Sequence, residues 1–121
     1  MSSESLRFIN SGLLESNCAG DPAMMRDIIT MGLQSVSKSI TDAGIYLESE
    51  DCDKLARVLH KLRPSLCYCG INNLTDELMV LEKNIRDNNN LPALRERIMA
   101  MLDTLQQVHT EMEQKLSSLS G

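Results

Sequence analysis

Apolar residues that recur every three or four positions constrain the fold of this chain more than any other feature. The longest such stripe consists of Met25, Ile29, Gly32, Val36, Ile40, Ala43 and Leu47. Residues with this spacing fall on one face of an α-helix. No segment shows the apolar–polar alternation of a half-buried strand. The sequence therefore predicts an all-α protein.

Shorter stripes and capping residues predict where the other helices begin and end. A short helix is expected over Ser5–Glu15, and Asp21-Pro22 reads as an N-cap followed by a first-turn proline. The next helix is expected to begin with Asp51 as its N-cap and to end at Gly70. The last two stripes are Leu74, Leu78, Leu81 and Ile85, then Leu94, Ile98, Met101, Leu105, Val108, Met112 and Leu116. Asn72-Asn73 lead into the fourth helix, Asp87–Asn90 read as a loop, and Pro92 opens the last helix.

These stripes predict how the helices pack together. Four long amphipathic helices with short connections bury their stripes as an antiparallel four-helix bundle, with the short additional N-terminal helix at one end. The chain of 121 residues has the size of one domain, so we expect a single helical domain over residues 1–121. Gly32 lowers helix propensity, which suggests a close helix–helix approach there.

Composition and charge narrow the classes of function. The net charge is −5 and the Lys and Arg residues are scattered, which argues against nucleic acid or an anionic membrane as partner. No apolar run approaches the roughly 20 residues of a membrane span, and the N-terminus lacks signal-peptide features. The four cysteines form no Cys-x-x-Cys pair and fit reduced thiols. We therefore expect a cytoplasmic monomer with protein partners.

His60 is the candidate reactive residue. It lies roughly 120–140° around its helix from the centre of the apolar stripe, so it is expected to face solvent. Four small or apolar residues share its face: Ala56, Pro64, Cys67 and Ile71. Arg57 and Arg63 lie three residues to either side, close enough to screen a phosphate. An exposed imidazole is a neutral nucleophile at cytosolic pH, and no glycine-rich phosphate loop is present. The phosphoryl group would therefore come from another protein.

The segment from His60 to Gly70 resembles the motif of the histidine-containing phosphotransfer (HPt) domain family. In that motif a histidine is followed by an apolar residue two positions on, a small polar residue, and a glycine ten positions after the histidine. Here these positions are taken by His60, Leu62, Ser65 and Gly70. Gly20-Asp21-Pro22 and the stretch with Leu78, Leu81 and Glu82 resemble further family features. The resemblance covers about residues 5–118.

The resemblance implies a phosphoryl carrier rather than an enzyme. His60 would accept a phosphoryl group through Nε2 from a receiver-domain aspartate and pass it to a second receiver. The partners would be receiver domains of hybrid histidine kinases and response regulators, which would hold the Mg²⁺, while this chain would bind no cofactor or metal. Arg63, Lys61 and Arg57 would neutralise charge. The docking surface would consist of Ala56, Pro64, Cys67, Gly70 and Ile71.

Two positions depart from the family pattern. Arg63 replaces the usual lysine and keeps its charge with a different geometry. Pro64 replaces the usual glycine. A proline inside a helix removes one backbone hydrogen bond, here to the His60 carbonyl, so the helix is expected to kink at His60.

Alternative interpretations remain at this stage. The bundle could be a non-catalytic adaptor that binds a receiver or kinase without transferring phosphate. A bundle with a buried metal or cofactor would need inward-facing His or Glu residues, which the stripes lack. His109 lies at the margin of the last stripe, and Cys67 and Cys69 point to different helix faces. The acidic residues Asp51, Asp53, Asp76, Glu77 and Glu82 are interpreted as caps and solvated positions without partners.

Overall fold

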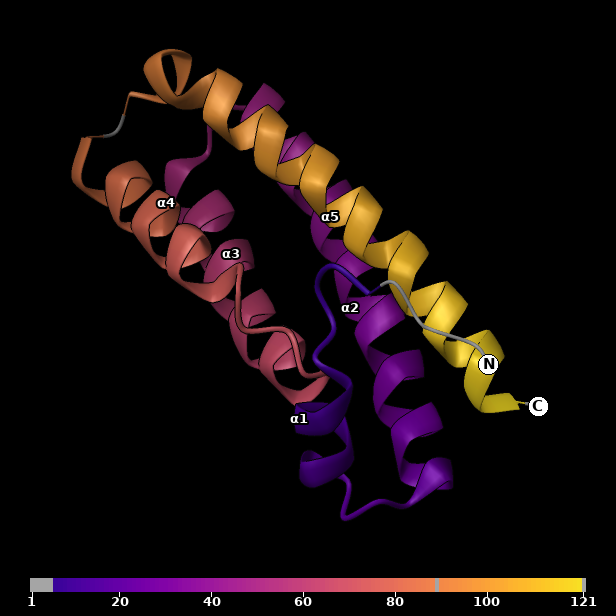
Figure 1. Cartoon of the computed structure of the whole chain (residues 1–121). Helices are drawn as coiled ribbons and strands as arrows, with labels where there is room; N and C mark the ends of the chain where they lie inside the picture. Colours follow the sequence, from indigo (N-terminus) through magenta and orange to yellow (C-terminus); the bar gives the residue numbers. More distant parts are fainter. Residues whose placement is uncertain (1–5, 89, 121) are drawn as a thin grey trace.

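The computed structural model describes residues 6–88 and 90–120, and these form five α-helices (Figure 1). Their bounds are α1, Ser11–Asn17; α2, Pro22–Glu48; α3, Cys52–Tyr68; α4, Thr75–Asn88; and α5, Leu91–Ser120. The described residues contain no strand. The prediction of an all-α bundle with a short N-terminal helix is confirmed.

The helices are arranged as two packed pairs. In Figure 1, α3 and α4 lie side by side at the left, while α2 and α5 run together at the right. The α2–α3 packing joins the pairs, whereas α4 and α5 touch only slightly. The core between them is built from aliphatic side chains such as Ile29, Leu59, Leu78 and Leu105, all fully buried. Burial of these stripes is what drives the helices together.

The predicted helix starts of α2 and α3 are confirmed. The Asp21 side chain accepts a hydrogen bond from the Ala23 amide at 3.0 Å, and Pro22 is the first residue of α2. The Asp51 side chain accepts one from the Lys54 amide at 3.1 Å at the start of α3. Each cap satisfies an amide that has no partner within its helix. Because only a short turn separates them, α3 begins at the end of the bundle where α2 ends.

Two glycines occupy positions where a larger residue would not fit. A Cβ atom on Gly32 would overlap Met112 of α5 and Cys69 at the end of α3, which confirms the predicted close approach. Gly70 has φ +82°, and the following Ile71 amide donates to the Leu66 carbonyl at 2.9 Å. This pattern ends a helix with a left-handed residue. Gly70 therefore terminates the helix that carries His60, as predicted.

The predicted helix over Ser5–Glu15 is wrong in its position. Ser5 lies outside the described residues, and the segment before Asn10 is not helical; α1 begins only at Ser11. The amides of Arg7, Phe8 and Ile9 instead donate to the buried Glu111 carboxylate of α5, at 2.6–2.8 Å. A carboxylate that accepts three amides replaces the helical hydrogen bonds of this stretch. The contact spans about a hundred residues of sequence.

The predicted loop over Asp87–Asn90 is also too long. Asp87 and Asn88 belong to α4, and Asn89 lies outside the described residues. The last helix begins at Leu91, directly before Pro92.

Within the described residues, no helix combines the length and the apolar composition that a membrane crossing requires.

Candidate functional site

His60 lies in the middle of α3 with its side chain 60% exposed. Its neighbours Leu59 and Leu62 are fully buried, so the helix is anchored to the core on the opposite side. This anchoring holds the imidazole at the surface without burying either ring nitrogen in the core. The prediction that His60 faces solvent is confirmed.

Glu82 of α4 is the centre of an ion-pair network at His60. Its side chain is only 11% exposed, and its Oε2 atom lies 3.3 Å from His60 Nδ1. Arg63 Nη2 donates to Glu82 Oε1, and Arg86 Nε donates to Glu82 Oε2, both at 3.1 Å. The interpretation of Glu82 as a solvated residue without a partner is wrong. Two guanidinium groups offset the cost of burying this carboxylate.

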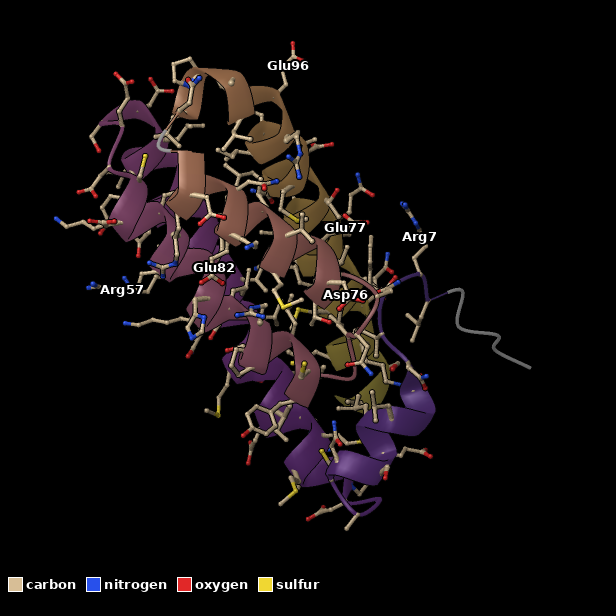
Figure 2. All side chains as sticks on the ribbon, turned by 90° about the vertical axis from the view of Figure 1, so that its left-hand side faces the viewer. Arg7, Arg57, Asp76, Glu77, Glu82 and Glu96 are labelled. Carbon is tan, nitrogen blue, oxygen red and sulfur yellow. The ribbon has the colours of Figure 1, made fainter. Side chains whose placement is uncertain are left out.

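The buried apolar face of α4 fixes the position of the Glu82 carboxylate. Leu78, Leu81 and Ile85 are buried against the bundle, and Glu82 follows Leu81 by one position on the edge towards α3. Figure 2 looks onto the α3–α4 layer. Glu82 lies near the middle of this layer, and Arg57 is to its left at a similar height. The site is therefore shared between two helices.

The network bears on which nitrogen of His60 carries the proton. Two groups contact His60 Nδ1. Arg63 Nη2 lies 3.0 Å from it, and Glu82 Oε2 lies 3.3 Å from it. A guanidinium can only donate, whereas a carboxylate can only accept. When Nδ1 carries a proton it donates to Glu82, and Nε2 keeps a free lone pair. When Nδ1 lacks the proton it accepts from Arg63, and Nε2 is protonated.

Only the first arrangement leaves Nε2 nucleophilic. In it, Arg63 keeps its bond to Glu82 Oε1, so Arg63 loses only one of its two contacts. His60 Nδ1–H then donates to the charged Glu82 carboxylate, and a hydrogen bond to a charged acceptor is stronger than one to a neutral acceptor. A carboxylate that orients a histidine through the nitrogen opposite the reacting one is a recurrent device. Arg63 lies nearer to Nδ1 than Glu82 does, at 3.0 Å against 3.3 Å, and a nucleophilic Nε2 requires the arrangement in which the Nδ1 proton points to Glu82.

The other two predicted cations lie apart from this network. Arg57 and Lys61 are exposed on α3 and line a groove that faces α2. Neither has a hydrogen-bond or ion-pair partner within the described chain. They flank His60 along the helix but do not touch its ring or Glu82. Of the three predicted cations, the structure brings only Arg63 to His60.

The predicted docking surface is only partly at the surface. Pro64 and Cys67 are exposed. Ala56 and Ile71 are fully buried, so their assignment to an exposed strip is wrong. The α3 helix packs against both α2 and α4, and the Ile71 amide donates to the Leu66 carbonyl where the chain turns after Gly70. Gly70 is itself buried and acts as the helix stop.

Two exposed apolar residues near this surface were missed. Tyr68 at the end of α3 and Met31 of α2 are 64% and 66% exposed. Together they line a small hollow of about 100 Å³ between the two helices. Met31 lies off the α2 stripe, which was the signal in the sequence. Large apolar side chains exposed beside a reactive group indicate a contact surface.

The remaining titratable residues do not assemble a second reactive centre. His109 is 27% exposed and contacts Glu113 at 3.6 Å on the same helix. No group of three or more His, Cys, Asp or Glu in the described segments is placed to hold a metal ion. Burial raises the pKa of the Cys69 thiol to about 12, whereas Cys67 is exposed. The two cysteines point to different faces, as predicted.

Comparisons with known proteins agree with this geometry. Residues 27–117 match the Hpt domain family. The fold is similar to the crystal structure of the HPT domain from an Hpt sensor hybrid histidine kinase of Shewanella. That comparison has a TM-score of 0.80 at 23% identity and covers 93% of this chain and 97% of the other. No curated protein matches this chain in sequence.

Proposed function

Because the chain belongs to the Hpt domain family, we propose that it carries a phosphoryl group on His60 Nε2 between two receiver domains. Membership supports a phosphotransfer role in two-component signalling and a carrier rather than a catalyst. The observation that supports the assignment to His60 is the exposure of its side chain beside a buried carboxylate. It is an exposed imidazole with its other nitrogen held by Glu82 at 3.3 Å.

The transfer step uses three of the chain's side chains. The Nε2 lone pair attacks the phosphorus of an aspartyl phosphate, and the bond from phosphorus to the aspartate oxygen breaks as the N–P bond forms. The aspartate leaves as a carboxylate. The ring now carries a positive charge that Nδ1–H shares with Glu82 through its hydrogen bond. Arg63, 3.0 Å from the ring, is close enough to turn towards the phosphoryl oxygens.

The return step is the reverse of the first. The carboxylate of a second receiver attacks the phosphorus, the N–P bond breaks, and the lone pair returns to Nε2. The proton on Nδ1 stays in place throughout, so the ring needs no proton transfer. Glu82 thereby serves both directions of transfer equally well.

The receiver would supply the rest of the chemistry. We expect Mg²⁺ on the receiver, and docking over the exposed Pro64 and Cys67, extended by Tyr68 and Met31. This surface surrounds His60 on the side away from Glu82 and leaves Nε2 open to approach. We expect the carrier to act as a monomer in the cytoplasm.

A phosphotransfer assay tests the proposal. The protein is incubated with a phosphorylated receiver domain, and the acid lability of the transferred phosphate is measured. We expect acid-labile phosphate on the wild type and on His109→Gln, but none on His60→Gln, with the same thermal melt for all three. An exposed residue contributes little to packing, so the fold should persist. Labelling of His60→Gln but not of His109→Gln would reject the assignment.

A further inference from the structure

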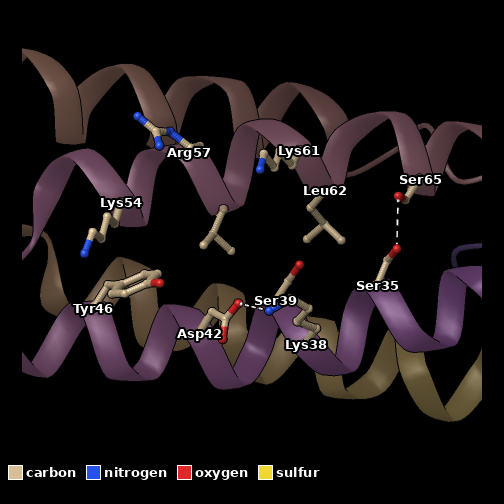
Figure 3. Close-up of a pocket in the computed structure, with 11 residues that line it drawn as sticks. Ser35, Lys38, Ser39, Asp42, Tyr46, Lys54, Arg57, Lys61, Leu62 and Ser65 are labelled. Atoms are coloured by element: carbon tan, nitrogen blue, oxygen red, sulfur yellow. Dashed lines mark hydrogen bonds and ion pairs between the residues drawn. The ribbon is translucent and has the colours of Figure 1, made fainter.

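A groove of about 410 Å³ lies between α2 and α3, and Glu82 is not among the residues that line it (Figure 3). Cationic side chains from both helices line it: Lys38 from α2, and Lys54, Arg57 and Lys61 from α3. Its volume is within the range of about 300–1,000 Å³ typical of small-molecule sites. The phosphotransfer mechanism does not use this hollow.

The charge of the groove is opposite to that of the whole chain. The groove gathers four of the twelve Lys and Arg residues but only one of the seventeen Asp and Glu residues, Asp42. Its lining therefore carries a net charge of +3, four cations minus one carboxylate, in a chain of net charge −5. Concentrated positive charge in a concave site attracts anions.

Most of these cations are available to a ligand. Arg57 and Lys61 have no partner within the described chain, while Lys54 Nζ lies 3.8 Å from Asp51 and 5.7 Å from the centre of the Tyr46 ring. Only Lys38 is closely paired, at 2.8 Å from Asp42. By contrast, Arg63 and Arg86 outside the groove are both bound by Glu82.

Hydroxyl groups and apolar carbon complete the lining. Ser65 donates to Ser35 across the groove at 3.3 Å, and Ser39 lies on the same face of α2 (Figure 3). The half-buried Tyr46 and Val58 contribute apolar surface. Hydroxyls donate hydrogen bonds to phosphate oxygens, and lysines bind phosphate as point charges. A small ligand fits the hollow better than a protein surface, which needs about 800 Å² of contact on each side.

We propose that the α2–α3 groove binds a small molecule that carries a chain of phosphate groups. The cations of α3 are spread along one wall from Lys54 to Lys61, so a linear polyanion contacts more of them than a single phosphate does. Recognition comes from side chains, since the sequence has no glycine-rich phosphate loop. This site is separate from the His60 chemistry, and its occupancy can be measured in His60→Gln.

Isothermal titration calorimetry with sodium tripolyphosphate tests the proposal. We expect binding that weakens as NaCl is raised, because salt screens exposed charges. The double variant Arg57→Gln/Lys61→Gln should bind about tenfold more weakly. The control Lys83→Gln/Arg95→Gln removes the same charge outside the groove and should bind within about twofold of the wild type. Both double variants are checked by thermal melts.

Three further ligands identify the source of the phosphate chain. Adenosine triphosphate that binds as tightly as tripolyphosphate supports recognition of the phosphate chain alone. Tighter binding of the triphosphate than of tripolyphosphate, with no binding of adenosine, supports a nucleotide. Adenosine binding as tightly as its triphosphate would overturn the proposal, because charge would not be the feature recognised. Orthophosphate binding equal to tripolyphosphate would overturn the chain requirement.

Two other results would overturn it as well. The first is no detectable tripolyphosphate binding to the wild type at millimolar concentration. The second is equal weakening in the groove variant and the control variant, which would indicate a general charge effect. If the groove variant instead loses only receiver binding, the groove belongs to the docking surface for the receiver and takes no small ligand.

Discussion

Glu82 accepts hydrogen bonds from two guanidinium groups and faces one imidazole nitrogen, all within 3.3 Å. At the scale of single residues, this carboxylate sets the chemistry of His60 more than any neighbour on α3 does. A neutral imidazole carries its proton on Nδ1 or on Nε2, and we expect Glu82 to favour the tautomer protonated on Nδ1. We therefore expect the reactivity of His60 to depend on a residue 22 positions away in the sequence.

We expect Glu82→Ala to slow phosphoryl acceptance by about ten- to a hundredfold, the range seen when the outer partner of a ligating histidine is removed. Glu82→Gln keeps an oxygen that can accept from Nδ1–H but loses its charge, so its rate should be intermediate. Nitrogen NMR of the imidazole reads the tautomer directly. The proton should shift from Nδ1 towards Nε2 in Glu82→Ala, and an unchanged tautomer would contradict this role.

Pro64 is expected to be tolerated because it is compact. It lies exposed one turn after His60, and Pro64→Gly should keep the transfer rate because glycine also leaves the imidazole open. Pro64→Glu should slow transfer by at least about tenfold, because a like charge beside a phosphate costs more than about 1.4 kcal/mol. The initial rate from a phosphorylated receiver is the measurement, with folding checked by melting. An unchanged rate in Pro64→Glu would move the docking surface elsewhere.

The sequence predicted the exposure of His60 correctly but not its environment. The motif and the helical position both pointed to this histidine, and its exposure followed from the stripe on α3. Glu82 was misread because its partners lie on a different helix, and helical periodicity says nothing about which helix packs on which side. Ala56 was placed at the surface for the same reason, although it is fully buried in the packed bundle.

At the scale of elements, local signals set most helix ends. Asp21, Asp51 and Gly70 act through atoms within a few residues of themselves, so the sequence predicts them well. The N-terminal segment is the exception, because Glu111 of α5 holds the amides of Arg7, Phe8 and Ile9. No local pattern contains that contact.

A pair of glycine substitutions tests the element that ends α3. Gly70→Ala should lower the free energy of unfolding by about 2 kcal/mol or more, because φ is +82° and the new Cβ would lie 2.7 Å from the Asn10 carbonyl oxygen. Gly44→Ala in α2 is the control, since its Cβ would meet nothing within 4 Å. It should raise stability by about 0.5–1 kcal/mol. Urea denaturation measures both, and a loss in Gly44→Ala equal to that in Gly70→Ala would contradict the account.

At the scale of the whole molecule, the buried Cys69 thiol links stability to pH. Desolvation by burial, with a smaller effect from Cys18, raises its pKa from 9.0 to about 12. Between these values the unfolded chain loses this proton and the folded chain keeps it. The free energy of unfolding should therefore fall by about 1.4 kcal/mol per pH unit above pH 9 from this group alone.

Comparison of variants isolates that contribution. Cys69→Ala removes the group, so its stability should fall less steeply between pH 9 and 11 than that of the wild type. The exposed Cys67→Ala is the control and should keep the wild-type slope. Urea denaturation at each pH gives the slopes. Parallel curves for the wild type and Cys69→Ala would show that this thiol does not couple to unfolding.

The division of the proposed His60 site between α3 and α4 means that we expect full reactivity only in the assembled bundle. A peptide containing all of α3 would keep the histidine, Arg63 and Pro64, yet its ring would have no carboxylate to direct the proton. A molecule in which α4 has come loose from α3 would lose the same direction. We therefore expect the reactivity of His60 to report on the integrity of the bundle, because a molecule with a displaced α4 would accept phosphate more slowly.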